Sequence, residues 1–274
     1  MFGKLLKHDF IATGRVMGIV YGVFAAVALY LVGSVALSKE LDSIGEMLGY
    51  IVLCLISFAN FVVTAAVVML NFQKSVYGDQ GYLTFTLPVK SESVLFSKMF
   101  VSIFWYIAAF LAFLATARIA LWSMGEMMGD EGLSLVEMLL GMVQEGLSVN
   151  VLIVYAVTYV IQFFFLVVTF TMIAYFAITV SNTRPFQKHY VLFTILFLAV
   201  VGIAVLKIMD IVTEYIHIGF NYSYVTEKLT FAVGADAMVA LAHIDIAAPI
   251  ALILISVGLF FGTYILMKKK INIR

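Results

Sequence analysis

Six long apolar segments dominate the pattern of hydrophobic and polar positions along the chain. They cover residues 16–37, 47–72, 99–123, 149–180, 190–206 and 246–267. A helix needs about 20 predominantly apolar residues to cross the hydrocarbon layer, because its backbone polar groups must be satisfied within the segment. The pattern therefore predicts six transmembrane helices, and an even number of spans places both chain ends on the same side of the membrane.

The composition agrees with this pattern. Of the 274 residues, 64% are apolar and 12% are charged, about half the roughly 25% of charged residues in soluble domains. This composition excludes an ordinary soluble protein. We expect an all-α integral membrane protein in which residues 1–274 form one transmembrane domain.

The first apolar segment has a competing interpretation as a cleavable signal peptide, because Lys4 and Lys7 precede it. The apolar region of a signal peptide has about 7–15 residues. The segment 16–37 is longer than that, so we interpret it as an uncleaved first span.

The positive charges are distributed unequally between the two sets of loops. Of the 16 Lys and Arg residues, 12 lie in the termini and alternate loops, three lie in the other set, and Arg118 lies within the third span. Lys and Arg are retained on the cytoplasmic side. We therefore expect a multi-pass protein of a bacterial plasma membrane with both termini in the cytoplasm.

Residues 1–15 have the pattern of a helix that lies on the membrane surface. Apolar and small residues recur at helical spacing, and cationic residues fill the remaining surface. The apolar set is Phe2, Leu5, Leu6, Phe10 and Thr13, and the cationic set is Lys4, Lys7, His8 and Arg15. Such a helix buries its apolar stripe among acyl chains and keeps its cations near anionic headgroups. The alternative is a frayed cytoplasmic tail.

Two longer segments face the outer side in this topology. Residues 124–148 carry five acidic residues and an apolar helical face, which predicts a short interfacial helix. Residues 210–245 contain several aromatic residues and are amphipathic enough to lie in the outer interface or dip partly into it. We therefore expect outer interfacial helices in addition to the six spans.

The first cytoplasmic loop, residues 73–98, is compact and partly apolar. Gly78 and Gly81 permit a turn, and Pro88 ends an apolar stretch. Ser91 is suited to cap a helix that leads through Lys98 into the third span. Because an apolar patch facing the cytosol usually meets a partner, this loop is the main candidate for a docking segment.

The sequence lacks the motifs of several enzyme classes. No P-loop and no G-x-S-x-G elbow is present. The four His residues are scattered, and Cys54 is the single cysteine, so neither a metal site nor a disulfide framework is predicted. We expect no catalytic or metal-binding residues in this chain and no cofactor bound by it.

A few polar residues within the spans are candidates for a translocation path. They are Asn60, Arg118 and Gln162. Arg118 lies near the outer end of its span, where its side chain can snorkel to headgroups; the alternative is that it lines a path for an anionic or peptide cargo, near Gln162. Glycines at every fourth position, Gly14, Gly18 and Gly22 and the pair Gly258 and Gly262, favour close helix packing within one chain or between two.

The cytoplasmic loop resembles a pattern of the ABC-2 type of ABC exporter permeases. The similar stretch is GDQGYLTFTLPV at residues 78–89, followed by Ser97 and Lys98. The six-span plan, the N-terminal surface helix and the interfacial outer segments are also similar to that family. Family members often carry an acid directly before the glycine, where this chain has Gln80 preceded by Asp79.

The resemblance implies a coupling helix in this loop that contacts a separate ATPase. The residues at that contact would be Asp79, Gln80, Gly81, Tyr82, Leu83 and Thr84, with Lys4, Lys7 and His8 on the surface helix beside it. It further implies two permease subunits, identical or homologous, over two ATPase subunits that bind ATP and magnesium. The expected partners are these subunits and the lipid bilayer, without nucleic acid.

The expected function is outward movement of an amphipathic peptide, lipid or drug-like cargo. Two alternatives belong to other classes. An ion-coupled secondary transporter normally shows internal repeats and ionisable residues at mid-membrane, and neither is evident in the sequence. A non-transporting membrane scaffold or sensor would use its outer loops instead. Only the exporter requires an ATPase subunit, so association with one distinguishes the three.

Overall fold

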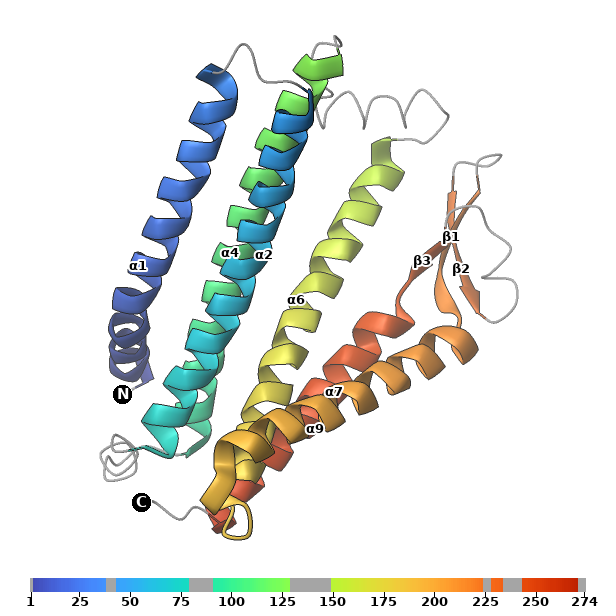
Figure 1. The fold of residues 1–274 in the computed structure, drawn as a ribbon. Helices are drawn as coiled ribbons and strands as arrows, with labels where there is room; N and C mark the ends of the chain where they lie inside the picture. The colour runs from blue at the N-terminus through green and yellow to red at the C-terminus, as the bar shows by residue number, and fades with distance from the viewer. Residues whose placement is uncertain are drawn as a thin grey trace. The chain divides into compact units, whose positions relative to one another are not determined.

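Six helices long and apolar enough to cross a membrane make up most of the described chain. The computed structural model describes residues 2–37, 43–78, 91–128, 149–223, 228–233 and 243–270. The helices are α1 (Phe2–Leu37), α2 (Ser43–Val76), α4 (Ser91–Met128), α6 (Val149–Ser181), α7 (Tyr190–Tyr215) and α9 (Ala247–Lys270), shown in Figure 1. These helices confirm the predicted helical, multi-pass membrane architecture.

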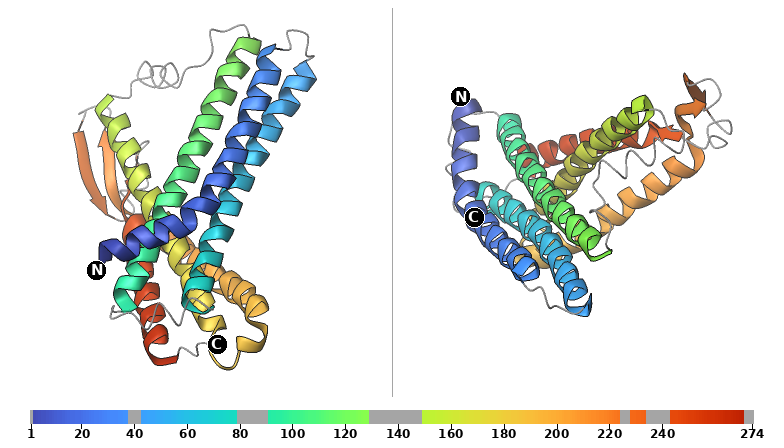
Figure 2. Two further views of the ribbon diagram at one scale, coloured as in Figure 1. Left: turned by 90° about the vertical axis from the view of Figure 1, so that its left-hand side faces the viewer. Right: turned by 90° about the horizontal axis from the view of Figure 1, so that it is seen from above.

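Several helices extend beyond the expected spans. Helix α1 is continuous from Phe2, and Figure 2 shows that its first turns bend away from the direction of the rest. Helix α4 begins at Ser91, as the capping pattern predicts. Helix α7 extends past the expected end of its span to Tyr215. The outer segment expected to be helical at 124–148 is helical to Met128, and residues 129–148 lie outside the described residues.

The chain groups into two compact units. The first consists of Met1–Asn71 and Phe96–Gly141, and the second of Phe72–Leu95 and Met142–Arg274. Helix α1, most of α2 and most of α4 therefore belong to the first unit. Helices α6, α7 and α9 belong to the second.

Helix α6 forms the core of the second unit, packed against α7 and α9. Its C-terminal half is almost entirely buried. Thr169 Oγ1 of α6 donates a hydrogen bond to the carbonyl oxygen of Leu252 on α9 at 3.2 Å, and Ser181 and Thr194 join α6 to α7 through their hydroxyls at 2.6 Å. Because Pro185 cannot continue a helix, α6 ends at Ser181 and a tight turn with the short 3₁₀ helix η1 (Gln187–His189) leads into α7.

The segment between α7 and α9 contains a small antiparallel sheet. Its strands are β1 (Ile218–Ser223), β2 (Lys228–Val233) and β3 (His243–Asp245), in the order β2-β1-β3. The register pairs Phe220 with Phe231 and with Ile244. The expectation of interfacial helices is therefore wrong for these residues. Their apolar and polar positions alternate with a period of two, which favours strands over helices.

Two glycines of α9 provide a test of how the second unit packs. A Cβ atom on Gly262 would lie 3.0 Å from Cε2 of Phe176 on α6, whereas one on Gly258 would meet nothing within 4 Å. We expect Gly262→Leu to lower the free energy of unfolding by about 1–3 kcal/mol through overpacking. The matched change Gly258→Leu is expected to have little effect. Titration of the purified protein with sodium dodecyl sulfate in mixed micelles measures both, and equal losses would contradict the packing.

Candidate functional site

The two helix ends that flank the predicted coupling segment form the candidate functional site. The segment's own residues Asp79, Gln80, Gly81, Tyr82, Leu83 and Thr84 lie outside the described residues. Helix α2 ends at Val76, before the segment, and α4 begins at Ser91, after it. The helices that contact these two ends are the ones that a movement of the segment would affect first.

A glycine with no room for a side chain follows two residues after the end of α2. The backbone N–H groups of Tyr77 and Gly78 both donate to the carbonyl oxygen of Gln73, at 2.9 and 3.0 Å. A Cβ atom on Gly78 would lie 2.9 Å from the carbonyl oxygen of Lys74. This clash is with backbone, which cannot move aside as a flexible side chain can. Gly78 therefore fixes the point at which the chain leaves α2.

Aromatic residues hold the end of α2 against α6. Phe72 and Tyr175 stack with ring centroids 3.8 Å apart, and Phe72 also meets Tyr77 edge to face. All three side chains are buried. Burial raises the pKa of Tyr77, an effect that its interaction with Thr179 only partly offsets, so the phenol stays protonated at physiological pH. Aromatic pairs of this kind add about 0.5–1.5 kcal/mol beyond their buried area.

Two amide side chains join the end of α2 to the end of α6, and each donates a hydrogen bond to the other. Gln73 Nε2 donates to Asn182 Oδ1 at 3.1 Å, and Asn182 Nδ2 donates to Gln73 Oε1 at 2.9 Å. Asn182 Nδ2 also donates to the carbonyl oxygen of Ile178 at 2.7 Å. We call the Gln73–Asn182 pair the amide bridge. Because each amide supplies both a donor and an acceptor, the bridge joins the last turn of α2 to the end of α6 through two hydrogen bonds within the second unit.

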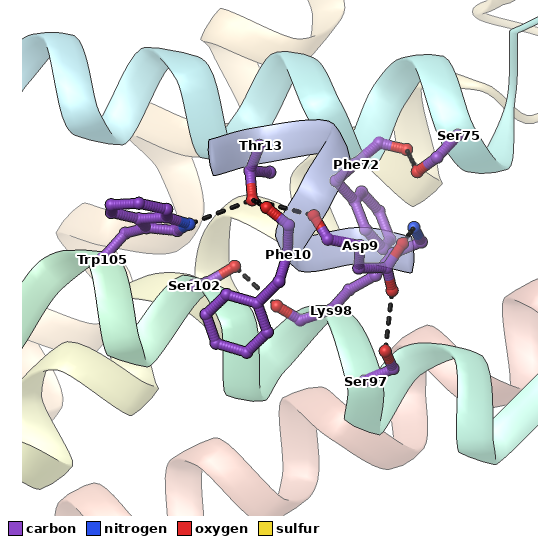
Figure 3. Close-up of polar contacts among 9 residues, drawn as sticks. All are labelled: Asp9, Phe10, Thr13, Phe72, Ser75, Ser97, Lys98, Ser102 and Trp105. Atoms are coloured by element: carbon purple, nitrogen blue, oxygen red, sulfur yellow. Dashed lines mark hydrogen bonds and ion pairs between the residues drawn. The ribbon is translucent and has the colours of Figure 1, made fainter. Parts of the chain in front are cut away.

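A buried ion pair lies at the start of α4. The Asp9 carboxylate on α1 accepts from Ser97 Oγ at 2.7 Å through Oδ2 and from Lys98 Nζ at 3.1 Å through Oδ1. Figure 3 shows the carboxylate facing these two consecutive residues of α4. We call Asp9, Ser97 and Lys98 the Asp9 cluster. It ties the first turns of α1 to the second turn of α4.

Further contacts extend this connection along α1 and α4. Trp105 Nε1 donates to Thr13 Oγ1 at 3.0 Å, and Thr13 Oγ1 donates to the carbonyl oxygen of Asp9 at 2.8 Å. The Phe10 and Phe104 rings meet edge to face at 5.0 Å, and Tyr21 donates to the carbonyl oxygen of Trp105 at 3.0 Å. A threonine bonded to the carbonyl four residues earlier often bends a helix, which accounts for the bend of α1 near Thr13.

The burial of the Asp9 cluster makes its charges costly to separate. Asp9 is 5% and Lys98 3% exposed. Removing one partner from a buried pair leaves an uncompensated charge and typically costs about 3–5 kcal/mol. The pair Lys207–Asp210 on α7, at 3.3 Å, differs because both of its side chains are mostly exposed. Ion pairs of that exposed kind are worth about 0–1 kcal/mol.

The predicted surface-helix residues lie on the exposed side of α1. Lys4, Lys7 and His8 are all exposed, whereas Asp9 and Thr13 are buried. The two sides of α1 thus differ as the periodicity predicts. The structure corrects one detail. The buried side of this segment contains Asp9, which is not a member of the predicted apolar set.

The predicted path residues lie on three different helices. Asn60 is on α2 and Arg118 on α4, both in the first unit, and Gln162 is half-buried on α6 in the second. The side chain of Arg118 is outside the part of the structure that is described. Asn60 is buried, and neither Nδ2 nor Oδ1 of its amide has a hydrogen-bond partner in the described part of the chain. An unsatisfied buried amide costs about 1–3 kcal/mol.

Sequence reasoning missed Asp9, and a signal for it exists. Positions 6, 9, 13 and 17 are three or four residues apart and so share one face of a helix. Asp9 is the acidic member of this face, between Leu6 and the buried Thr13 and Met17. An acid on an otherwise apolar or small-residue face requires a cationic or hydrogen-bonding partner.

A double-mutant cycle tests the Asp9 cluster. We expect Asp9→Asn and Lys98→Met each to lower the free energy of unfolding by about 3–5 kcal/mol, because each leaves the other group buried without its counter-charge. The double variant is expected to lose less than the sum, with a coupling of about 0.5–3 kcal/mol. Titration with sodium dodecyl sulfate in mixed micelles gives the four values.

The exposed pair on α7 is the matched control for this cycle. Asp210→Asn removes the same charge from an ion pair of similar length, and we expect a loss below about 1 kcal/mol because solvent screens that pair. Additive effects of the Asp9 and Lys98 substitutions, or losses no larger than that of Asp210→Asn, would show that the buried pair does not join α1 to α4.

No protein-family model matches the chain, and no curated protein or solved structure matches it at a significant level.

Proposed function

We propose that the chain is the membrane-spanning subunit of an ATP-driven exporter of the ABC-2 type, which moves an amphipathic cargo and is powered by a separate ATPase. Six apolar helices fit a membrane subunit. The stretch 78–89 is similar to the family's coupling motif. The observation that carries the proposal is the anchoring of both helix ends beside this stretch.

The contacts at the end of α2 and at the start of α4 would connect a coupling segment to helices of both units. The boundaries between the units fall at Asn71/Phe72 within α2 and at Leu95/Phe96 within α4, on either side of the segment. The amide bridge and the Phe72–Tyr175 stack tie the end of α2 to α6 in the second unit. The Asp9 cluster ties α4 to α1 in the first unit. Under this proposal a movement of the segment would reach α6 through the end of α2 and α1 through the start of α4.

The polar residues within the helices fit roles in transport. The buried amide of Asn60 has no hydrogen-bond partner in the described part of the chain, and a polar group of this kind fits a contact that forms when the helices around it separate. The exposed Lys4, Lys7 and His8 fit a surface helix among anionic headgroups. Under this proposal ATP and magnesium are bound by the partner ATPase.

One observation favours the second candidate, an ion-coupled transporter. Asp9 and Lys98 are ionisable, buried and paired within helices that are apolar enough to span, and such residues often belong to ion pathways. The two candidates differ in their need for an ATPase. An exporter copurifies with vanadate-sensitive ATP hydrolysis, whereas an ion-coupled transporter does not.

Truncation of Tyr82 tests the coupling contact. We expect Tyr82→Ala to weaken association with the ATPase by roughly 1–3 kcal/mol, the loss typical of an interface anchor, or about 5- to 150-fold in Kd. The tagged chain is purified from its native membranes, and vanadate-sensitive ATP hydrolysis is measured per mole of chain. Tyr159→Ala on α6 is the control, since it deletes the same side chain at a mostly exposed position.

Two results would contradict the proposal. The first is wild-type chain that retains cargo transport in vesicles but carries no vanadate-sensitive hydrolysis. The second is a pair of variants, Tyr82→Ala and Gly81→Val, that insert normally and keep full ATPase association. The first result would favour an ion-coupled transporter, and the second would remove the coupling role of the segment.

The proposed orientation is tested by cysteine labelling. In a Cys54→Ala background, single cysteines replace Lys188 in the turn after α6 and Thr230 in β2, both of which are exposed. With the termini in the cytoplasm, an impermeant maleimide is expected to label position 230 in intact cells and position 188 only after the cells are opened. The reverse pattern would invert the topology and end the exporter proposal.

A further inference from the structure

The small sheet between α7 and α9 has one apolar face and one polar face. At every second register position an apolar residue pairs with an apolar residue, as in Ile218 with Val233 and Phe220 with Phe231. The intervening pair, Asn221 with Thr230, is polar. Because directly opposed residues of antiparallel strands share a face, the two kinds of residue lie on opposite sides.

The apolar face is exposed in the described part of the chain. Phe231 is 61% and Val233 58% exposed, and Phe220 is 37% exposed. The rings of Phe220 and Phe231 meet edge to face at 5.6 Å, so they form one aromatic patch. On the other face Thr230 Oγ1 donates to the carbonyl oxygen of Asn221 at 3.3 Å. An open patch of this kind requires an occupant.

Short connections hold the sheet at the ends of two apolar helices. Residues 216–217 separate α7 from β1, and Ile246 alone separates β3 from α9. The Ile246 N–H donates to the carbonyl oxygen of Ile218 at 3.0 Å, and the Asp245 carboxylate accepts from the Ala247 N–H at 2.8 Å. Figure 1 shows the strands continuing from α7 and leading back to α9. The sheet therefore cannot move far from the membrane surface that these helices reach.

The exposed apolar surface is continuous from α7 into the sheet. Ile211, Tyr215 and Ile216 are exposed along the last turns of α7 and the residue after it. Helix α7 is apolar and the least buried of the six candidate spans, so its exposed side faces lipid. Phe220 of the patch follows four residues after Ile216, and Phe231 and Val233 lie beside β1 through strand pairing.

We propose that the apolar face of this sheet lies on the bilayer, at the boundary between headgroups and acyl chains where α7 ends. Aromatic side chains are enriched at that boundary. The strands β2 and β3 are the two edges of the sheet among the described strands, and an open sheet edge cannot enter the hydrocarbon core. The sheet is therefore a peripheral anchor, with its polar face toward water. This inference requires only that α7 and α9 span a membrane, and it holds whatever the chain transports.

Spin labels on the two faces test the proposal. In the full-length Cys54→Ala chain, Phe231→Cys and Thr230→Cys carry a nitroxide, and the protein is reconstituted in vesicles of phosphatidylcholine and phosphatidylglycerol. Power saturation then compares collision with oxygen, which concentrates in lipid, and with a water-soluble nickel chelate. We expect the oxygen-to-nickel ratio at 231 to be several-fold higher than at 230. Val233→Cys, a smaller change on the same face, is expected to behave like 231.

Three other results are possible, in which water, a second copy of the chain or another part of the protein lies against the apolar face. Each of them would overturn the proposal. Equal, low ratios at 230, 231 and 233 mean that the apolar face is in water. Labels at 231 and 233 that are shielded from both reagents, with spin–spin broadening between chains, mean that a second copy covers the face. Shielding from both reagents without broadening means that another part of the protein covers it.

Discussion

A polar group within a hydrocarbon layer has no water to replace a lost partner, and this constraint explains most of the polar contacts in the chain. Ser and Thr hydroxyls on the helices donate to carbonyls three or four residues earlier, as Thr13, Ser57 and Thr64 do. Larger polar groups need partners from other helices. Asp9 finds them on α4, and Asn182 on α2.

Buried polar and aromatic contacts to other helices lie at the end of α2 and at the start of α4, on either side of the predicted coupling segment. The amide bridge and the aromatic stack connect α2 to α6, and the Asp9 cluster connects α4 to α1. Each contact is buried and directional, so it resists sliding better than apolar packing alone. Such connections suit a part of the molecule that transmits force. They would serve an exporter driven by a partner, and they would also hold a transporter of another kind together.

The same need for hydrogen-bond partners applies to the sheet that follows α7. Its open edges need water or headgroups, while its exposed aromatic face needs an apolar surface. Only an interfacial layer offers both. Membrane contact in this chain therefore extends past the spans, and the short connections to α7 and α9 make the sheet part of how these helices are positioned.

The class of the protein and most of its helices can be predicted from the amino-acid sequence. Runs of apolar residues long enough to cross a bilayer predict spans reliably because lipid permits few other structures, and Ser91 was a sufficient signal for the start of α4. The strands were missed because they are only 3–6 residues long. In segments this short, mixed aromatic and polar residues are compatible with both an amphipathic helix and a strand.

The tertiary structure alone decided which polar residues meet. Asp9 and Lys98 are far apart in the chain, as are Gln73 and Asn182, and a single sequence carries no record of such pairs. It also decided which glycines are needed for packing, since a Cβ atom on Gly262 would press against Phe176 whereas one on Gly258, in the same helix, would meet nothing within 4 Å. Local patterns depend on neighbours along the chain, whereas these contacts depend on how separate helices are brought together.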